Sequence, residues 1–426
     1  MKKLTAIAVV FALAAGGVFA ADLGASIFGT VNLLQGDTNE KADDDLPGVF
    51  GSGNQGRLRL EGSGENDDGT FGAWYRWEPT HWDAQKVFGI AWWKPIDQFK
   101  LSIGGNPDGI YAKEGYAGWM FHQTANDSGV VCDDQAWGAP YAVNGEKMRD
   151  AFYGGFGGNA LMLDIKPVDM FGLNIVLPYF EFGSGKAQGQ GLGEVFKNMT
   201  IQVDVNMDFG NIALTFDMAP WTKDIDKPNG AIGGKFYLYF GLTAIENLNL
   251  DFSVGLGLPK KVGNESVMEP IGIGLAAKYA INDAFGIKAR VLAKFGGKYY
   301  QSFSEDDFTE DELAALEIYA GILGIDLDEY LARMGGLVDN PFGIIFDVLP
   351  YYAISDSFTV FADIGINMMA PKGGDSVLGF HFNPYIQIGQ EWGPSFFAGV
   401  KVWTNGKVGD KTPINFAIPI GLEVSF

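Results

Sequence analysis

Few residues of this 426-residue chain have the type and spacing that metal or acid–base chemistry requires. No serine, histidine and acid form a recognisable catalytic triad. The single cysteine, Cys132, has no partner for a disulfide. None of the three histidines stands at the spacing of metal ligands: His81, His122 and His381. The sequence therefore predicts neither an enzyme nor a bound cofactor or metal, and a lone histidine such as His381 is expected to be an ordinary polar group.

Charged side chains are the other chemical resource of the chain, and acids dominate them. Asp and Glu number 52 against 30 Lys and Arg, which gives a formal net charge of -22. This excess of acid excludes a nucleic-acid partner, because binding to phosphates needs a basic surface. Charged residues make up only 19% of the chain, whereas aromatic residues reach 14% and glycines number 60. That composition is typical neither of disorder nor of a small disulfide-stapled protein.

The elements that carry these side chains alternate between apolar and polar residues. A period of two indicates β-strands with one apolar face. It runs through residues 236–242, 248–254, 287–294, 358–368 and 380–388. It is clearest in the even-numbered positions at the end of the chain, namely Ile414, Phe416, Ile418, Ile420, Leu422, Val424 and Phe426.

So many strands with one apolar face cannot all pack around a single apolar interior. Two long soluble domains are the alternative, but no linker divides the chain. We therefore predict an all-β fold, a transmembrane antiparallel up-and-down β-barrel whose apolar face meets lipid and whose polar face lines a lumen. Short turns rich in Gly, Asn and Asp alternate with longer polar stretches, which gives about 18 strands. Weak patterns near Val87–Trp93 and Leu161–Lys166 leave about 16 as the alternative.

The first residues are typical of a secretory signal. Lys2 and Lys3 precede an apolar stretch that ends in small residues before Ala20. We predict a signal peptide over residues 1–20 and a single outer-membrane barrel over residues 21–426. No later run is apolar and long enough for a transmembrane helix.

Two long insertions interrupt the strand pattern. Residues 106–159 separate the fifth and sixth predicted strands. Residues 303–336 are predicted to be helical, because Thr309 and Glu312 form a capping box and apolar residues follow at helical spacing. We expect this helical insertion to be extracellular and to lie over the outer mouth of the barrel.

The chain resembles the bacterial outer-membrane porin class, in its architecture and in the run of Ile420, Leu422 and Val424 before the terminal Phe426. The resemblance implies a general-diffusion pore, in contact with outer-membrane lipid, through which ions and small hydrophilic solutes pass passively. It also implies that the outer-membrane assembly machinery reads Phe426, and that the chain forms a homotrimer. In such porins the third long loop narrows the barrel, and residues 106–159 occupy that place.

Sorting charges by strand face gives a lumen wall that is nearly balanced, with Arg290, Asp347 and Asp363 among its members. We hypothesise that a basic strip faces an acidic constriction loop and sets a transverse field across the pore. The alternative is that the basic residues pair with Glu61, Glu78 and neighbouring acids. The strip consists of Arg57, Arg59, Arg76 and Lys100. The loop acids are Asp108, Glu114, Asp127, Asp133, Asp134, Glu146 and Asp150.

Aromatic residues predicted to face the lumen support a second hypothesis, stacking on sugar rings in a sugar-selective porin. The alternative is that they pack against inward loops. These residues are Trp74, Trp93, Tyr237, Tyr239, Tyr385 and Trp403. A third reading is a surface-exposed adhesin or structural outer-membrane protein with a plugged barrel.

Overall fold

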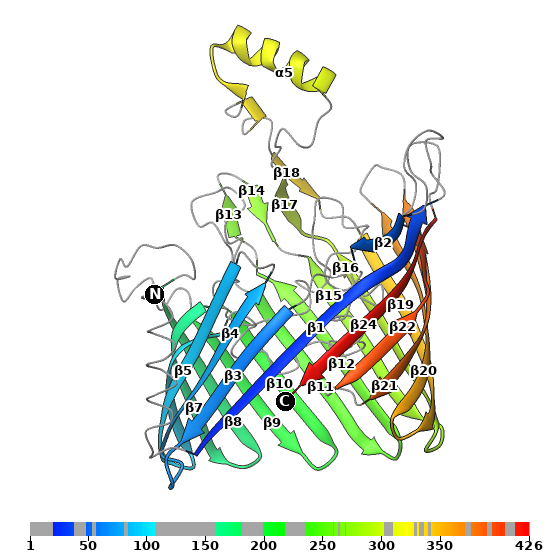
Figure 1. Ribbon diagram of the computed structural model, residues 1–426. Coiled ribbons are helices and arrows are strands. Elements are labelled where there is room, and N and C mark those ends of the chain that lie inside the picture. The colour runs from blue at the N-terminus through cyan, green and yellow to red at the C-terminus, as the bar shows by residue number, and fades with distance from the viewer. Residues whose placement is uncertain are drawn as a thin grey trace, which may run out of the picture.

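Antiparallel strands joined to their neighbours in sequence dominate the computed structural model of the chain (Figure 1). The structure describes residues 20–37, 48–52, 57–80, 84–106, 158–180, 199–217, 235–258, 260–262, 265–268, 270–301, 310–327, 330–331, 336–339, 342–370, 376–389, 394–404 and 414–425. Most of the predicted signal peptide and the terminal Phe426 lie outside these residues.

The main sheet contains twenty strands within the described ranges. In chain order they are β1 (Ala20–Asp37), β2 (Gly48–Ser52), β3 (Arg57–Glu65), β4 (Phe71–Thr80), β5 (Ala84–Ile96), β6 (Phe99–Asn106), β7 (Gly158–Val168), β8 (Phe171–Phe180), β9 (Thr200–Met207), β10 (Gly210–Asp217), β11 (Lys235–Ile245), β12 (Leu248–Gly257), β15 (Ile271–Ala280), β16 (Phe285–Phe295), β19 (Phe342–Ser355), β20 (Phe358–Ala370), β21 (Val377–Gly389), β22 (Ser395–Gly399), β23 (Lys401–Thr404) and β24 (Asn415–Ser425).

The sheet closes on itself, because β24 pairs with β1 from Ser26–Ser425 to Asp37–Asn415. Two crossings of the wall are each made of two strands. Both β2 and β3 pair with β1, and both β22 and β23 lie between β21 and β24. The twenty described strands therefore make 18 crossings, which confirms 18 rather than 16. Closure leaves no edge of unpaired backbone groups, as a wall in lipid requires.

The register places apolar side chains on the outside of the barrel. On β20, Ile364 lies opposite Phe382 of β21, and the two side chains are 45% and 44% exposed. Their neighbours on the inner face, Asp363 and Asn383, also lie opposite each other and are buried. The predicted orientation is confirmed: the apolar face is outward, as in a membrane-spanning barrel, and the polar face is inward.

Short turns connect neighbouring strands at one end of the barrel, and their residues suit tight backbone geometry. In the β15–β16 turn the Oδ1 of Asn282 accepts hydrogen bonds from the backbone N–H groups of Ala284 and Phe285, at 2.9 and 2.8 Å. In the β11–β12 turn Asn247 has a φ of 62°, a left-handed conformation that asparagine tolerates better than most residues. These turns are among those that the sequence predicted.

Further described elements lie beyond the opposite end of the barrel (Figure 1). Two small hairpins lie there, β13 (Lys260–Val262) with β14 (Glu265–Val267) and β17 (Lys298–Gln301) with β18 (Gly336–Asp339). Between β17 and β18 the predicted helix is present as α5 (Glu310–Leu323).

The helix α5 stands clear of the barrel instead of lying across its mouth (Figure 1). Ile318 and Tyr319 are 66% and 58% exposed, so the wall does not cover them. None of the described helices is long and apolar enough to cross a membrane.

Candidate functional site

The inner face of the barrel is the candidate functional site, because it gathers the charged and amide side chains of the wall. Register partners in an antiparallel sheet share a face, so one set of alternate residues points inward all round the ladder. Glu61 with Arg76, Lys100 with Asp164, and Arg290 with Asp347 are such partners.

The strip of basic residues on the first strands is already partnered where its side chains are described. The Nε of Arg76 on β4 donates to the Oε1 of Glu61 on β3, at 2.6 Å. The Arg76 guanidinium also lies over the ring of Trp74, with Cζ 5.3 Å from the ring centroid. The register places Arg57 opposite Phe28 and Arg59 opposite Ser26. For Arg76 the structure therefore shows the alternative arrangement, pairing with a neighbouring acid of the wall.

Lys100 does not lie beside Arg76, so the expected clustering of the strip is wrong for this residue. Its Nζ lies 3.2 Å from the Oδ2 of Asp164 on β7. Arg76 on β4 lies opposite Phe88 on β5, and the adjacent Gly89 lies opposite Gly105 on β6. Following this register from Arg76 across β5 leads to a point on β6 about six residues beyond Lys100. That offset is about 20 Å along the strand. Strand order alone could not reveal it, because Lys100 stands next to the short β5–β6 turn.

On β9 and β12 the inner face carries acids that accept hydrogen bonds from amide and hydroxyl groups. Asp204 on β9 accepts from the Nδ2 of Asn174 at 3.0 Å and from the Nε2 of Gln202 at 2.9 Å. The hydroxyl of Tyr239 on β11 donates to the Oδ1 of Asp251 on β12 at 2.7 Å. The wall therefore carries negative charge that is hydrogen-bonded in place.

A buried ion pair joins β16 and β19 on the inner face of the described wall. The Nε of Arg290 donates to the Oδ2 of Asp347 at 2.5 Å, and each side chain is 1% exposed. The register places these residues directly opposite each other. A buried ion pair of this kind is tolerated only with close geometry, since both groups have lost their water.

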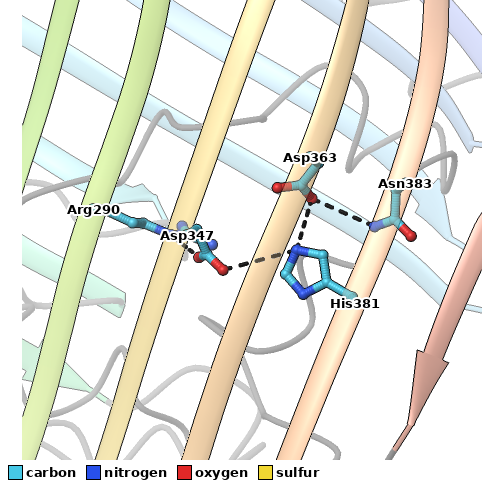
Figure 2. A network of polar contacts seen from close by, with 5 residues as sticks. All are labelled: Arg290, Asp347, Asp363, His381 and Asn383. Carbon is cyan, nitrogen blue, oxygen red and sulfur yellow. Dashed lines mark hydrogen bonds and ion pairs between the residues drawn. The ribbon is translucent and has the colours of Figure 1, made fainter.

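His381 on β21 extends this pair across two more strands (Figure 2). Its Nε2 lies 3.0 Å from the Oδ2 of Asp363 on β20 and 3.8 Å from the Oδ1 of Asp347. The Nδ2 of Asn383 donates to the same Oδ2 of Asp363, at 3.4 Å. We name these five residues the His381 cluster: Arg290, Asp347, Asp363, His381 and Asn383.

The His381 cluster depends on a glycine at its centre. Gly365 lies opposite Asp347 on one side and His381 on the other. A Cβ at Gly365 would overlap the imidazole ring and the Asp347 carboxylate. The missing side chain is therefore what lets groups from β19 and β21 meet across β20.

The lumen aromatics pack locally and do not all face inward. Trp93 is wrong as a lumen residue, because it lies on the outer face, 42% exposed, and stacks on Phe71. Its neighbour Trp92 occupies the inner face and covers Gly72. The reason is that both faces of β5 carry bulky apolar side chains, so the alternation is ambiguous there.

The other aromatics lie on the inner face of the wall. Tyr385 is buried and stacks on Phe361 with centroids 4.6 Å apart. Tyr237 and Tyr239 are buried on β11. Trp403 on β23 lies opposite His381. Tyr385 packs with Leu349, Phe397 and Phe361 in a small apolar cluster. This contact is local packing, the alternative to stacking on sugar rings.

The acids predicted to form a constriction loop lie outside the described residues, as does Cys132. The flanking strands β6 and β7 are the fifth and sixth crossings of the wall, the order predicted for the long third-loop segment. In the parts of the chain that the structure describes, no group of three or more His, Cys, Asp or Glu side chains could hold a metal ion.

Comparisons with known proteins find structural similarity without sequence similarity. No protein-family model and no curated protein matches the chain. An anion-selective porin from Comamonas acidovorans is similar at 9% identity and TM-score 0.49, over 95% of this chain and 99% of that one. A loop-deletion mutant of OmpT, an outer membrane protein of Vibrio cholerae, is similar at 12% identity and TM-score 0.45, over 96% of this chain and 100% of that one. A mutant of the Rhodopseudomonas blastica porin is similar at 12% identity and TM-score 0.41, over 95% of this chain and 99% of that one. These are likenesses to outer-membrane proteins, and the closed barrel of this chain rests on its own strand pairings.

Proposed function

We propose that this chain is a bacterial outer-membrane pore for the passive diffusion of ions and small hydrophilic solutes. The observation that carries the proposal is the closed wall of 18 crossings with an apolar outside and a charged inside. A barrel of 16 to 18 strands encloses room for water, whereas about eight strands leave only enough for side chains. Passage needs no covalent step, so we propose no catalytic residue.

The proposed mechanism combines size exclusion with electrostatic screening. Fixed charges in a narrow channel of low dielectric surroundings act strongly on passing ions and dipoles. The hydrogen-bonded acids on β9 and β12 and the pairs Arg76–Glu61 and Lys100–Asp164 supply such charges. We propose that the acidic segment 106–159 narrows the pore opposite Arg57, Arg59 and Arg76.

The rest of the proposal concerns export and assembly. A signal peptide over residues 1–20 would direct the chain out of the cytoplasm, and Phe426 would present it to the outer-membrane assembly machinery. The apolar outer face would meet lipid, and a homotrimer is the assembly that the class resemblance implies.

Conductance of the mature chain, refolded and inserted in a planar bilayer, tests the central proposal. We expect discrete steps whose size scales with salt concentration. A swelling assay with sugars of increasing size should show a rate that falls smoothly with solute size. Saturation by one sugar alone would indicate a sugar-selective pore instead.

The screening proposal has its own test in a salt gradient. Replacing Arg57, Arg59 and Arg76 together by glutamine should shift the reversal potential toward cations. A matched control is the replacement of Lys278, Lys288 and Lys294 by glutamine, which removes the same charge from another wall. An unchanged reversal potential in the first variant contradicts the strip.

One observation favours a second candidate, a surface protein with a plugged barrel. The inner side chains of β16 and β19–β21 are almost fully buried, with Arg290 1% and His381 2% exposed. Little of these side chains is left exposed to the lumen. Absence of any conductance from a correctly folded barrel would support the plugged candidate and contradict the pore.

A further inference from the structure

The His381 cluster contains a feature that passive diffusion does not require, an imidazole held between two carboxylates (Figure 2). The Nε2 of His381 faces both acids, at 3.0 Å from Asp363 and 3.8 Å from Asp347. Ionised carboxylates only accept hydrogen bonds, so Nε2 must carry a hydrogen in this geometry. Both ring nitrogens are buried without a regular hydrogen bond, and the second of them, Nδ1, lies farther from the two acids. It is the atom at which this imidazole gains or loses a proton.

The surroundings of His381 hold two acids on one side, and an indole and a lysine on the other. Asp347 from β19 and Asp363 from β20 face the ring, and Arg290 from β16 lies behind Asp347. On the opposite side β23 places Trp403 beside His381, with Lys401 two residues away on the same face. A change of charge at His381 is therefore felt directly by two acids on two other strands.

Burial makes this change of charge effective in the lumen. The side chains of His381, Asp347 and Asp363 are 1–2% exposed, so little water screens them. Imidazole is the side chain whose unperturbed titration falls between pH 5 and 8. Its protonation adds one positive charge to the wall as long as the two carboxylates keep their own protonation state.

We propose that His381 is a selectivity-determining residue, whose protonation sets the fixed charge of the lumen wall and makes the ion selectivity of the pore depend on pH. Loss of the proton leaves the wall more negative, so the pore favours cations more strongly as the pH rises. The inference rests on the proposed pore function and adds to it a regulated property of one wall.

The test is the reversal potential in a salt gradient at pH values from 5 to 8. We expect the wild type to shift toward cation selectivity as the pH rises, and His381→Gln to lose that shift. The matched control is the double variant His81→Gln/His122→Gln, which removes the other two histidines and should keep the shift. A shift that persists in His381→Gln overturns the proposal.

A spectroscopic measurement covers the case in which His381→Gln does not fold. The double variant retains one histidine, so an imidazole-labelled sample reports the protonation of His381 alone by NMR. We expect its signals to change between pH 5 and 8. A single protonation state across that range overturns the proposal.

The two levels of inference fail differently. A wild-type barrel that conducts no ions contradicts the pore and the selectivity role together. A conducting barrel with a reversal potential independent of pH contradicts the selectivity role alone.

Discussion

Two walls of the same barrel each hold an arginine–carboxylate pair, one partly exposed and the other buried. On β3 and β4 the Arg76–Glu61 pair spans 2.6 Å, and its side chains are 15% and 34% exposed. On β16 and β19 the Arg290–Asp347 pair spans 2.5 Å at 1% exposure for both. The chemistry and the distance are alike, so the difference lies in burial. A pair within reach of water contributes little to stability, whereas a buried pair must stay whole.

The two pairs also differ in what must fold before they form. Glu61 and Arg76 are 15 residues apart and meet across one hairpin. Arg290 and Asp347 are 57 residues apart, and the whole α5 insertion lies between them. A slip of one residue in the β16–β19 register would turn Asp347 to the apolar outer face. The buried pair therefore specifies a register that no short turn can set.

The largest expected effect comes from breaking the buried pair. Arg290→Met leaves Asp347 charged, buried and without its guanidinium, which should cost about 3–5 kcal/mol of unfolding free energy. Urea unfolding of the refolded barrel, followed by tryptophan fluorescence, measures it. Replacing both partners, in Arg290→Met/Asp347→Leu, should cost less than the single change. A single variant as stable as Glu61→Gln would remove the contrast between the two walls.

Gly365→Ala is the next largest change, and it tests the crossing point of the cluster. The new methyl group would overlap the His381 ring and the Asp347 carboxylate, so both must move. Overpacking of this kind costs about 1–3 kcal/mol. Gly172→Ala is the matched control on the inner face of β8, because its Cβ would meet Asp204 at an ordinary 3.4 Å. Equal unfolding midpoints for the two variants would contradict the geometry of the cluster.

The fold was predictable from the sequence because lipid imposes a simple pattern on every strand. Residues such as Ile364 and Phe382 must be outward and apolar, and the alternation that results gives both the face and the number of crossings. The pattern fails where both faces are apolar. On β5, Trp92 and Trp93 are equally suited to lipid and to packing inside, and the lumen residue was assigned to the wrong one of the two.

The candidate site was predictable residue by residue but not as an arrangement. Alternation assigns Arg290, Asp347 and Asp363 to the lumen, and it predicts an ordinary polar group at His381. Their meeting depends on the β16–β19 register across the α5 insertion and on Gly365, and alternation fixes neither. The separation of Lys100 from Arg76 has the same cause, since strand order does not fix the level of a residue along the wall.

Breaking the exposed pair should have a smaller effect than either buried change. Glu61→Gln removes the charge that faces Arg76 but keeps a hydrogen-bond acceptor at the same place. The expected loss is at most about 1 kcal/mol, because water can take over the remaining charge. The same urea unfolding experiment, run at low and at high salt, measures it. A loss of unfolding free energy as large as that of Arg290→Met would show that the Arg76–Glu61 pair is shielded from water as fully as the Arg290–Asp347 pair.

The smallest expected effect lies at the end of the barrel, where the acid of an ion pair is almost fully exposed. In the β5–β6 turn the Nζ of Lys94 lies 2.8 Å from Asp97, whose side chain is 88% exposed. The hydrogen bond and the charge of Lys94 lower the pKa of Asp97 below its ordinary value. A lowered pKa stabilises the fold above the ordinary pKa of an aspartate, and this contribution disappears as the pH falls through the lowered value. Because water screens both groups, Asp97→Asn should match the wild type in unfolding midpoint at pH 7 and again at pH 3. A variant that unfolds earlier at pH 7 only would show that ion pairs of this barrel matter without burial, and would contradict the contrast between the two walls.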